Sequence, residues 1–444
     1  MSSKLSLQLQ DFFNEQEIES EAVASRFVQR KSSLTGYAFT DTMMHSEFGT
    51  KTKSLNDETA YLHLHHAITI SKQGLDQRFS EASTLLLKRL VEKFLKEILP
   101  KESELEQFKD FQTVKIKDST CFQLPESYEK EYRGSGGAGS KAMIRIQFEY
   151  DFKSGTIYDL SIHSFNHQDQ TNSQETLGDI QAGDLLIRDL GYVNIKYLSH
   201  VDKNQAFYLN RPGSNIGMYE KNAAGKFKLI DYNKIKKMME TKKISIIEKE
   251  VYLSSKKNIK TRLVVELLPK DEYEKRIRKA KKEAVKKKRQ LSKNYMSRAA
   301  LNLFITNIPE QLRGADKLRS LYRIRWQVEL IFKTWKSFGL LHETKKMKIK
   351  RFETNLYAKL LKILLNWKIL WEAYSWYWGK GVFVSLIKFY KLLVGQQSEI
   401  KKSLQLGVDA LSDELFKLFT MPKSMIQSEI RKGKLSLIKI LLMN

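Results

Sequence analysis

The sequence predicts an α/β protein with helical ends and a β-rich centre. Up to residue 108, apolar side chains recur at helical spacing, most clearly in STLLLKRLVEKFLKEIL at 83–99. From Phe111 the pattern changes to alternation, and residues with high β-propensity become frequent. After Gly314 the helical pattern returns and continues almost to the end of the chain. These changes of period predict a sheet between two groups of helices.

The central region contains two sets of expected strands. The first set lies at 111–118, 143–152, 156–165, 184–189 and 206–211. Shorter strands at 226–232, 244–253 and 261–268 follow, broken by lysine-rich turns, which indicates a basic β-rich insertion. A highly charged helix at 272–290 and a strand at 301–307 complete the region.

Composition indicates a polyanionic partner. The 444 residues, long enough for two to four domains, include 77 Lys and Arg against 51 Asp and Glu, which gives a net charge of +26 and a pI near 9.7. This charge favours nucleic acid or an acidic membrane surface over a merely soluble basic protein. Residues 201–300 hold 28 Lys and Arg against 11 Asp and Glu, so attraction to phosphates is concentrated there.

Cysteine content and hydropathy predict a cytoplasmic protein. Cys121 is the only cysteine, which excludes an intramolecular disulfide and a thiolate metal site. The N-terminal MSSKLSLQLQDFFNEQE has no long apolar core, so we expect no signal peptide. The segment 356–378 contains four charged side chains and is expected to be a core helix rather than a membrane span.

Two aspartates follow from the expected strands. Asp118 ends the strand at 111–118, and Asp189 ends the strand at 184–189. Carboxylates from neighbouring strands can meet at one sheet edge and bind hard divalent cations, which prefer oxygen ligands. Strand-end aspartates are common, however, and a structural role for either residue alone is equally compatible with the pattern.

A third carboxylate lies on an expected helix, LYRIRWQVELIFKTWKSFGL at 321–340. Tyr322, Arg325, Glu329 and Lys336 are spaced so that they span about 60° of one helix face. Apolar residues gather on the opposite face: Ile324, Val328, Ile331, Trp335 and Phe338. The polar face could complete a metal site with Glu329 and hold phosphates with its two cations. The alternative is a solvated charged face, which the two upstream aspartates make less favourable.

The spacing Tyr322-x2-Arg325-x3-Glu329-x6-Lys336 resembles the Y–R–E–K signature of bacterial insertion-sequence transposases of family four. KDST at 117–120 and RDLGY at 188–192 are similar to that family's two aspartate blocks. LFITNIP at 303–309 resembles the strand before the signature helix, and GLDQRFSEAS at 74–83 a helical segment before the core. The resemblance covers roughly residues 20–345.

This resemblance implies an RNase H-like catalytic core interrupted by a β-rich insertion, with helical N- and C-terminal domains. We expect a helical N-terminal DNA-binding domain at 1–108, the first part of the core at 109–211, the basic insertion at 212–308, the signature helix at 309–345, and a helical dimerisation domain at 346–444. From the residues alone, a helical packing role for 1–108 is as compatible as a DNA-binding one.

The implied reaction is cut-and-paste transposition of double-stranded DNA at terminal inverted repeats, with excision through hairpinned ends and insertion into target DNA. Asp118, Asp189 and Glu329 would be the catalytic triad and the ligands of two Mg²⁺ ions, which Mn²⁺ could replace. The implied DNA contacts are Tyr322, Arg325, Lys336, Arg211 and Lys333. Two ends must be cut and joined together, so a homodimeric synaptic complex at the bacterial nucleoid is expected.

The expected insertion departs from some relatives, in which a tryptophan stacks against a base flipped out during hairpin formation. All six tryptophans of this chain lie at or after Trp326. The platform would then have to come from another aromatic residue, and the sequence does not distinguish among Phe207, Tyr208, Phe227, Tyr232 and Tyr252.

Other functions and sites compete with this prediction. A domesticated or inactive relative would act only as a repressor or structural DNA binder, and a basic peripheral membrane protein would use the apolar C-terminal helices. His63, His65 and His66 lack an HExxH pattern, so we interpret them as helix surface or core packing. The aromatic cluster at 367–378 is interpreted as core or subunit interface rather than a base-stacking surface.

Overall fold

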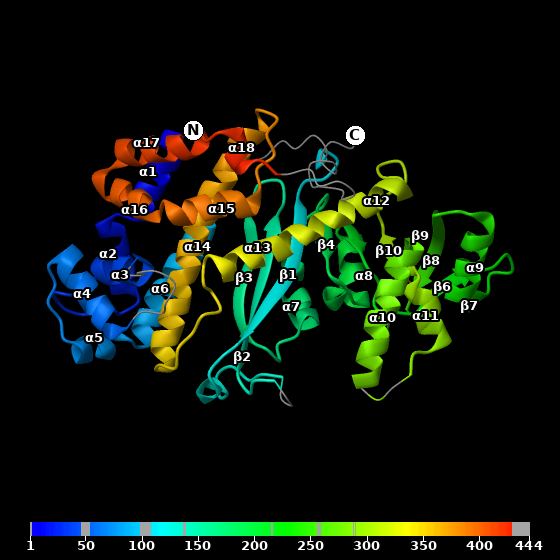
Figure 1. The fold of residues 1–444 in the computed structure, drawn as a ribbon, viewed down its shortest axis with the longest axis horizontal. Coiled ribbons are helices and arrows are strands. Elements are labelled where there is room, and N and C mark those ends of the chain that lie inside the picture. Colours follow the sequence, from blue (N-terminus) through cyan, green and yellow to red (C-terminus); the bar gives the residue numbers. More distant parts are fainter. Residues whose placement is uncertain are drawn as a thin grey trace.

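The strands of the chain form one ten-stranded mixed sheet with helices on both sides (Figure 1). The computed structural model describes residues 2–428 apart from 46–53, 98–107, 136–138, 215, 255–258, 287 and 289. The strand order is β3-β2-β1-β4-β5-β10-β9-β8-β6-β7. The strands are β1 (Val114–Gln123), β2 (Met143–Asp151), β3 (Ile157–Ser164), β4 (Leu185–Arg188), β5 (Phe207–Asn210), β6 (Met218–Lys221), β7 (Phe227–Leu229), β8 (Ile246–Leu253), β9 (Ile259–Leu267) and β10 (Leu301–Thr306).

The helices lie mainly at the two ends of the chain. The N-terminal group is α1 (Ser2–Phe12), α2 (Glu15–Ala24), α3 (Gly36–His45), α4 (Leu55–His66), α5 (Lys72–Arg78) and α6 (Glu81–Glu97). The central helices are α7 (Asp169–Glu175), α8 (Ile195–Lys203), α9 (Tyr232–Lys242), α10 (Lys270–Lys286) and α11 (Lys293–Ala299). The C-terminal group is α12 (Ala315–Tyr322), α13 (Trp326–Ser337), α14 (Ile349–Trp378), α15 (Leu386–Gly395), α16 (Gln397–Leu406), α17 (Val408–Phe419) and α18 (Lys423–Ile426).

The predicted α/β class is confirmed, and so is each strand expected from alternation. Strands β3, β2 and β1 pair antiparallel, and β1, β4 and β5 pair parallel, which agrees with an RNase H-like core. Strands β10, β9, β8, β6 and β7 continue the same sheet in antiparallel pairs. The helices α7, α8 and α9 were not predicted from the sequence; they are short, with seven, nine and eleven residues.

The end of β1 was predicted wrongly. The strand does not stop at Asp118 but continues to Gln123, because β2 pairs with it along its whole length, from Lys115↔Asp151 to Gln123↔Met143. Only the parallel partner β4 stops early, opposite Lys117. Asp118 therefore lies inside a strand, at the point where one of its two neighbours ends.

Two hydrophobic cores lie along the sheet. The larger includes the N-terminal helices, strands β1 to β3, α13 and α14, and the smaller is formed around β8 to β10 with α8 and α9. In the larger core Phe148 of β2 contacts Trp335 of α13 and Trp367 of α14 in edge-to-face geometry, with ring centroids 4.7 and 5.5 Å apart. Helices α13 and α14 thus cover one face of the first half of the sheet.

Helix α14 contains the aromatic cluster, and its packing confirms the core interpretation. Trp367, Tyr374 and Tyr377 are buried, and Trp371 and Trp378 pack partly against the same core. Among the described residues, none of the helices combines the length and apolarity that a membrane crossing requires.

The N-terminal histidines also have packing roles. His66 bonds to Asp41, which is 8% exposed and also contacts His45 and Lys401 of α16. His63 lies on the surface. This cluster connects the N-terminal helices to the C-terminal ones.

The turn between β2 and β3 gives a testable prediction about packing. Gly155 has φ +76°, its carbonyl accepts a hydrogen bond from Trp367 at 2.9 Å, and a Cβ there would lie 2.5 Å from the Trp371 ring. We expect Gly155→Ala to lower the free energy of unfolding by about 3 kcal/mol, because backbone strain and a clash with a packed ring add. Denaturant unfolding measures the loss.

Gly225→Ala is the matched control. Gly225 has nearly the same φ, +75°, but a Cβ there would meet only Lys221 Cε at 3.8 Å. Its loss should be about 1 kcal/mol, from strain alone. Equal losses in the two variants would contradict the role given to the Trp371 contact.

Candidate active site

Asp118 and Asp189 lie side by side because of the way β1 and β4 pair. The parallel ladder of these strands runs from Val114↔Leu185 to Lys117↔Arg188. Asp118 is the next residue of β1 and Asp189 directly follows β4 in extended conformation, so both side chains lie just beyond the last pair, on the face opposite Lys117 and Arg188. Asp189 continues into a short 3₁₀ turn at Leu190–Tyr192, which leads the chain away from the sheet. The parallel pairing therefore places Asp189 close to Asp118.

The sequence predicted that the four signature residues lie on one continuous α-helix, and this prediction is wrong. Tyr322 ends α12, Arg325 lies in a 3₁₀ turn at Arg323–Arg325, and Glu329 and Lys336 lie on α13. Because a 3₁₀ turn has about three residues per turn, side chains three apart are nearly eclipsed, and Tyr322 and Arg325 project in the same direction. The expected apolar face packs on the core: Ile324, Val328, Ile331 and Trp335 are buried, and Phe338 is partly buried.

Arg325 connects the helix to the sheet. Its guanidinium donates to Asp118 Oδ2 at 3.0 Å and also to Glu329 Oε1. The side chains of Asp118 and Arg325 are 19% and 15% exposed, so this contact is only partly screened by water. Glu329 is more open, at 35%. The three residues form a partly buried cluster in which one cation joins two carboxylates.

The cluster of Asp118, Asp189 and Glu329 contains more carboxyl groups than cations bonded to them. Burial raises the pKa of Asp118 to about 6; the Ser119 N–H and Arg325 counteract this, while Asp189 and Glu329 raise the pKa further. The effect of Asp189 and Glu329 on the pKa of Asp118 shows that both carboxyl groups lie close to Asp118. One guanidinium does not neutralise three carboxylates, and all the converging donors are hard oxygens. A divalent cation fits such a donor set.

The other signature residues surround this cluster. The Tyr322 hydroxyl is buried and has no hydrogen-bond partner among the described residues, and burial raises its pKa above the ordinary value. Lys336 Nζ donates to the Cys121 carbonyl at 3.1 Å, which places it beside β1 three residues beyond Asp118. Lys333 is exposed on α13 and is not part of the cluster.

A cationic cavity of about 410 Å³ opens beside Asp189. Arg211, Arg276 and Arg298 line it together with Tyr295. Within the described part of the chain, none of these arginines forms an ion pair with a carboxylate; Arg276 and Arg298 donate instead to backbone carbonyls, those of Ala299 and Pro212. Arg211 was predicted from the sequence as a phosphate contact, whereas Arg276, Tyr295 and Arg298 were not predicted. Their approach to Asp189 depends on the sheet extension through β9 and β10.

One further group of side chains could be mistaken for the metal site. His163, His167 and Glu175 have ligand atoms within 4.8 Å of one another, which within the described ranges is true of no other such group. The two imidazoles are stacked, with centroids 3.9 Å apart and planes 6° apart. Their in-plane lone pairs therefore point along parallel planes, and one ion cannot lie in both. We interpret this group as a stacked pair capped by Glu175.

An RNase H-like sheet that presents two aspartates and a helix that adds a glutamate define a nucleotidyl-transfer enzyme of the DDE class. Comparison with known proteins agrees. A family model described as "Transposase DDE domain" matches residues 109–365, more than half of the chain. The chain belongs to the DDE transposases, and specifically to those of bacterial insertion sequences.

Similar relatives are transposases of named insertion sequences. The transposase for insertion sequence element IS231F of Bacillus thuringiensis subsp. israelensis is 30% identical over 373 residues, covering 81% of this chain and 78% of that protein. The transposase for IS1151 of Clostridium perfringens is 31% identical over 393 residues, covering 84% and 81%. The transposase for IS231E of Bacillus thuringiensis subsp. finitimus is 31% identical over 356 residues, covering 76% and 74%.

The unpaired Tyr322 hydroxyl gives a stability prediction. Tyr322→Phe is expected to leave the free energy of unfolding unchanged or raise it by about 1 kcal/mol, because it removes a buried polar atom that has no partner. Tyr128→Phe is the control, since its hydroxyl donates to the Met347 carbonyl at 2.7 Å and accepts from the Met347 N–H at 3.1 Å. That variant should lose about 1 kcal/mol in urea unfolding. A loss of the same size in Tyr322→Phe would mean that its hydroxyl is bonded within the protein.

Proposed function

We propose that this transposase excises and inserts its element by cut-and-paste, with Asp118, Asp189 and Glu329 as the catalytic triad. The observation that carries the proposal is the single guanidinium of Arg325, which joins Asp118 on the sheet to Glu329 on α13 beside Asp189. A helix and two strands from distant parts of the chain thereby converge on one cation-demanding cluster. The intact triad supports an active enzyme rather than a relative that only binds DNA.

The triad is proposed to bind two divalent cations, Mg²⁺ by preference with Mn²⁺ as a substitute. When bound, such ions activate the attacking water or 3′-hydroxyl and stabilise the leaving oxygen. Asp118 and Asp189 hold their carboxylates on one face of the sheet, and Glu329 approaches from α13. Before DNA binds, Arg325 holds Asp118 and Glu329 together. When DNA binds, the Arg325 guanidinium can turn to a phosphate.

The cations and the phenol around the triad are proposed to hold the DNA backbone. Arg325 can bind a phosphate through two parallel N–H donors, and the unpaired Tyr322 hydroxyl can donate to the same group. Lys336 is placed beside β1 to neutralise a phosphate near the scissile bond. Lys333, exposed on the same helix, and Arg211, in the cavity, extend this basic surface in two directions.

For the hairpin step we propose that the cavity beside Asp189 receives a flipped nucleotide and that Tyr295 is its stacking platform. Tyr295 is 45% exposed and lines the cavity with three arginines. The five aromatic residues considered from the sequence fit less well: none of them lines the cavity, Tyr208 and Tyr232 are buried, and Phe227 packs edge-to-face on Tyr252. Aromatic stacking with nearby guanidinium groups suits a base and its phosphate.

The remaining assignments concern the domains and the assembly. Residues 212–308 are proposed as the insertion, supported by β6 to β9 and their helices, which widen the sheet beyond β10. The N-terminal helices are proposed to read the inverted repeats. A homodimer is proposed to hold two ends; exposed apolar side chains on the C-terminal helices, Leu406, Phe416 and Met425, mark the surface expected to meet the partner.

Loss of one triad carboxylate tests the active site. Asp189→Asn keeps the shape but weakens cation binding, and we expect cleavage of a DNA duplex carrying the element's ends to fall at least about a thousandfold. Asp202→Asn, an exposed aspartate of α8, is the control and should cleave at the wild-type rate. Wild-type cleavage by Asp189→Asn, with unchanged folding, would refute the triad.

Competition between Arg325 and the metal provides a second test. In the DNA-free protein, Arg325→Gln should bind Mn²⁺ about tenfold more tightly, because a positive charge leaves the carboxylate cluster. Lys333→Gln removes the same charge from the same helix outside the cluster and should change the affinity little. Manganese titration followed by electron paramagnetic resonance measures both. Equal affinities in the two variants would place the bound ion elsewhere.

A further inference from the structure

Both aspartates of the proposed triad directly follow a fully buried cation. Lys117 precedes Asp118, Arg188 precedes Asp189, and each cation is 0% exposed. Side chains alternate across a sheet, so the two cations point to the face opposite the aspartates. They are also register partners, and they form the last pair of the parallel ladder between β1 and β4.

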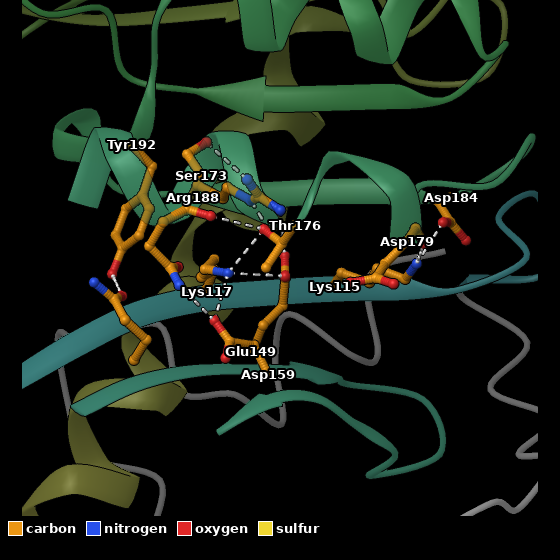
Figure 2. A network of polar contacts seen from close by, with 12 residues as sticks. Lys115, Lys117, Glu149, Asp159, Ser173, Thr176, Asp179, Asp184, Arg188 and Tyr192 are labelled. Atoms are coloured by element: carbon orange, nitrogen blue, oxygen red, sulfur yellow. Dashed lines mark hydrogen bonds and ion pairs between the residues drawn. The ribbon is translucent and has the colours of Figure 1, made fainter. Parts of the chain in front are cut away.

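Two acids complete a row of charges across four neighbouring strands. Glu149 of β2 is the register partner of Lys117, and Asp159 of β3 is the register partner of Glu149. We call Asp159, Glu149, Lys117 and Arg188 the charged row (Figure 2). Two anions and two cations make the row neutral. The row crosses β3, β2, β1 and β4. On β1 and β4 it lies one residue before Asp118 and Asp189, the proposed metal ligands.

The contacts within the charged row are close and shared. Glu149 Oε1 accepts from Arg188 Nη2 at 2.7 Å and Nε at 3.2 Å, while Glu149 Oε2 accepts from Lys117 Nζ at 3.3 Å. Lys117 Nζ also donates to Asp159 at 2.8 Å. Glu149 is thus bonded to both cations. From β2, it connects Lys117 of β1 to Arg188 of β4.

Helix α7 and the residue that ends it contact the row, and Figure 2 shows Ser173 and Thr176 beside Arg188 and Lys117. Ser173 Oγ accepts from Arg188 Nη1 at 2.9 Å, and Thr176 Oγ1 accepts from Lys117 Nζ at 3.0 Å. Asn172 donates to Asp159 at 3.0 Å. Beyond β4, the Arg188 N–H donates to Asn210 Oδ1 of β5 at 3.0 Å, which extends the connection to a fifth strand.

Stability alone does not account for such a row. Desolvation offsets much of the attraction in a buried ion pair, and apolar replacements of similar volume are often as stable. A buried charge that loses its partner, however, is strongly unfavourable. A slip of β4 against β1 by one residue would turn Arg188 to the opposite face, and Glu149 would lose one of its two cationic partners. The row therefore penalises a one-residue slip away from the register that places Asp118 beside Asp189.

We propose that the charged row is the positioning device of the active site, in which Glu149 fixes Asp118 and Asp189 at the spacing that shared cation binding needs. Glu149 is a positioning residue, since it acts from the opposite sheet face through Lys117 and Arg188. The inference rests on the proposed role of the two aspartates.

The test compares Glu149→Gln with Asp184→Asn. Glu149→Gln keeps the side-chain shape and removes the shared negative charge. Asp184, directly before β4, forms an equally buried ion pair with Lys115 of β1 at 2.6 Å (Figure 2). Lys115 lies three residues before Asp118, and Asp184 five residues before Asp189. Mn²⁺ affinity of the DNA-free protein, the Mg²⁺ concentration for half-maximal cleavage, and thermal unfolding are measured for both variants.

We expect Glu149→Gln to weaken Mn²⁺ binding, and to raise the Mg²⁺ requirement, by about tenfold, as for residues that orient metal ligands. Asp184→Asn should lower thermal stability comparably but leave both metal readouts within about twofold. Wild-type metal dependence in Glu149→Gln, or equal shifts in the two variants, would overturn the proposal. If Glu149→Gln does not fold, Lys117→Met/Asp159→Leu, which removes one cation and one anion together, is expected to show the same tenfold shift and is judged by the same outcomes.

The variant Asp189→Asn distinguishes failure of the positioning role from failure of the proposed triad. If Asp189→Asn still cleaves DNA, the triad assignment is wrong, and the positioning role proposed for the charged row is wrong with it. If Asp189→Asn is inactive while Glu149→Gln keeps wild-type metal dependence, only the positioning role fails.

Discussion

The parallel pairing of β1 with β4 is the constraint on which the site depends. It ends at Lys117↔Arg188, so the next residue on each strand, an aspartate, leaves the ladder on the same face. A shift of β4 by one residue would exchange its faces, turning Asp189 to the side of Lys117 and Arg188 to the side of Asp118. The active-site geometry is thus a consequence of strand register, and the register is held by charge on one face and by apolar packing on the other.

Apolar packing on the sheet explains how Glu329, more than a hundred residues after Asp189 in the sequence, comes close to the two aspartates. Trp335 of α13 packs on Phe148 of β2, and Phe148 is the register partner of Asp118. Burial of the helix's apolar face therefore fixes the height of α13 over β1. Glu329 and Arg325, on its other face, are then directed towards Asp118. Packing and chemistry use opposite sides of the same helix.

The basic block of the sequence has a location that composition alone could not give. Its strands extend the sheet through β10, and this extension brings Arg276 and Arg298 to the cavity beside Asp189. Three arginines without carboxylate partners in the described part of the chain create a local excess of positive charge next to an acidic cluster. This arrangement suits a DNA strand that has some phosphates against the arginines and another at the proposed metal site.

The sequence by itself determined the α/β class and every strand except β6, because period is a local property. It also singled out Asp118, Asp189 and Glu329 as candidate ligands from their spacing. It misplaced the end of β1 at Asp118, since continuation to Gln123 depends on pairing with β2. It treated residues 322–336 as one helix, although a 3₁₀ turn interrupts it. Tyr295, the cavity and the charged row were decided only by the tertiary structure. Each depends on residues far apart in the chain meeting across strands, and local patterns carry no information about which strands become neighbours.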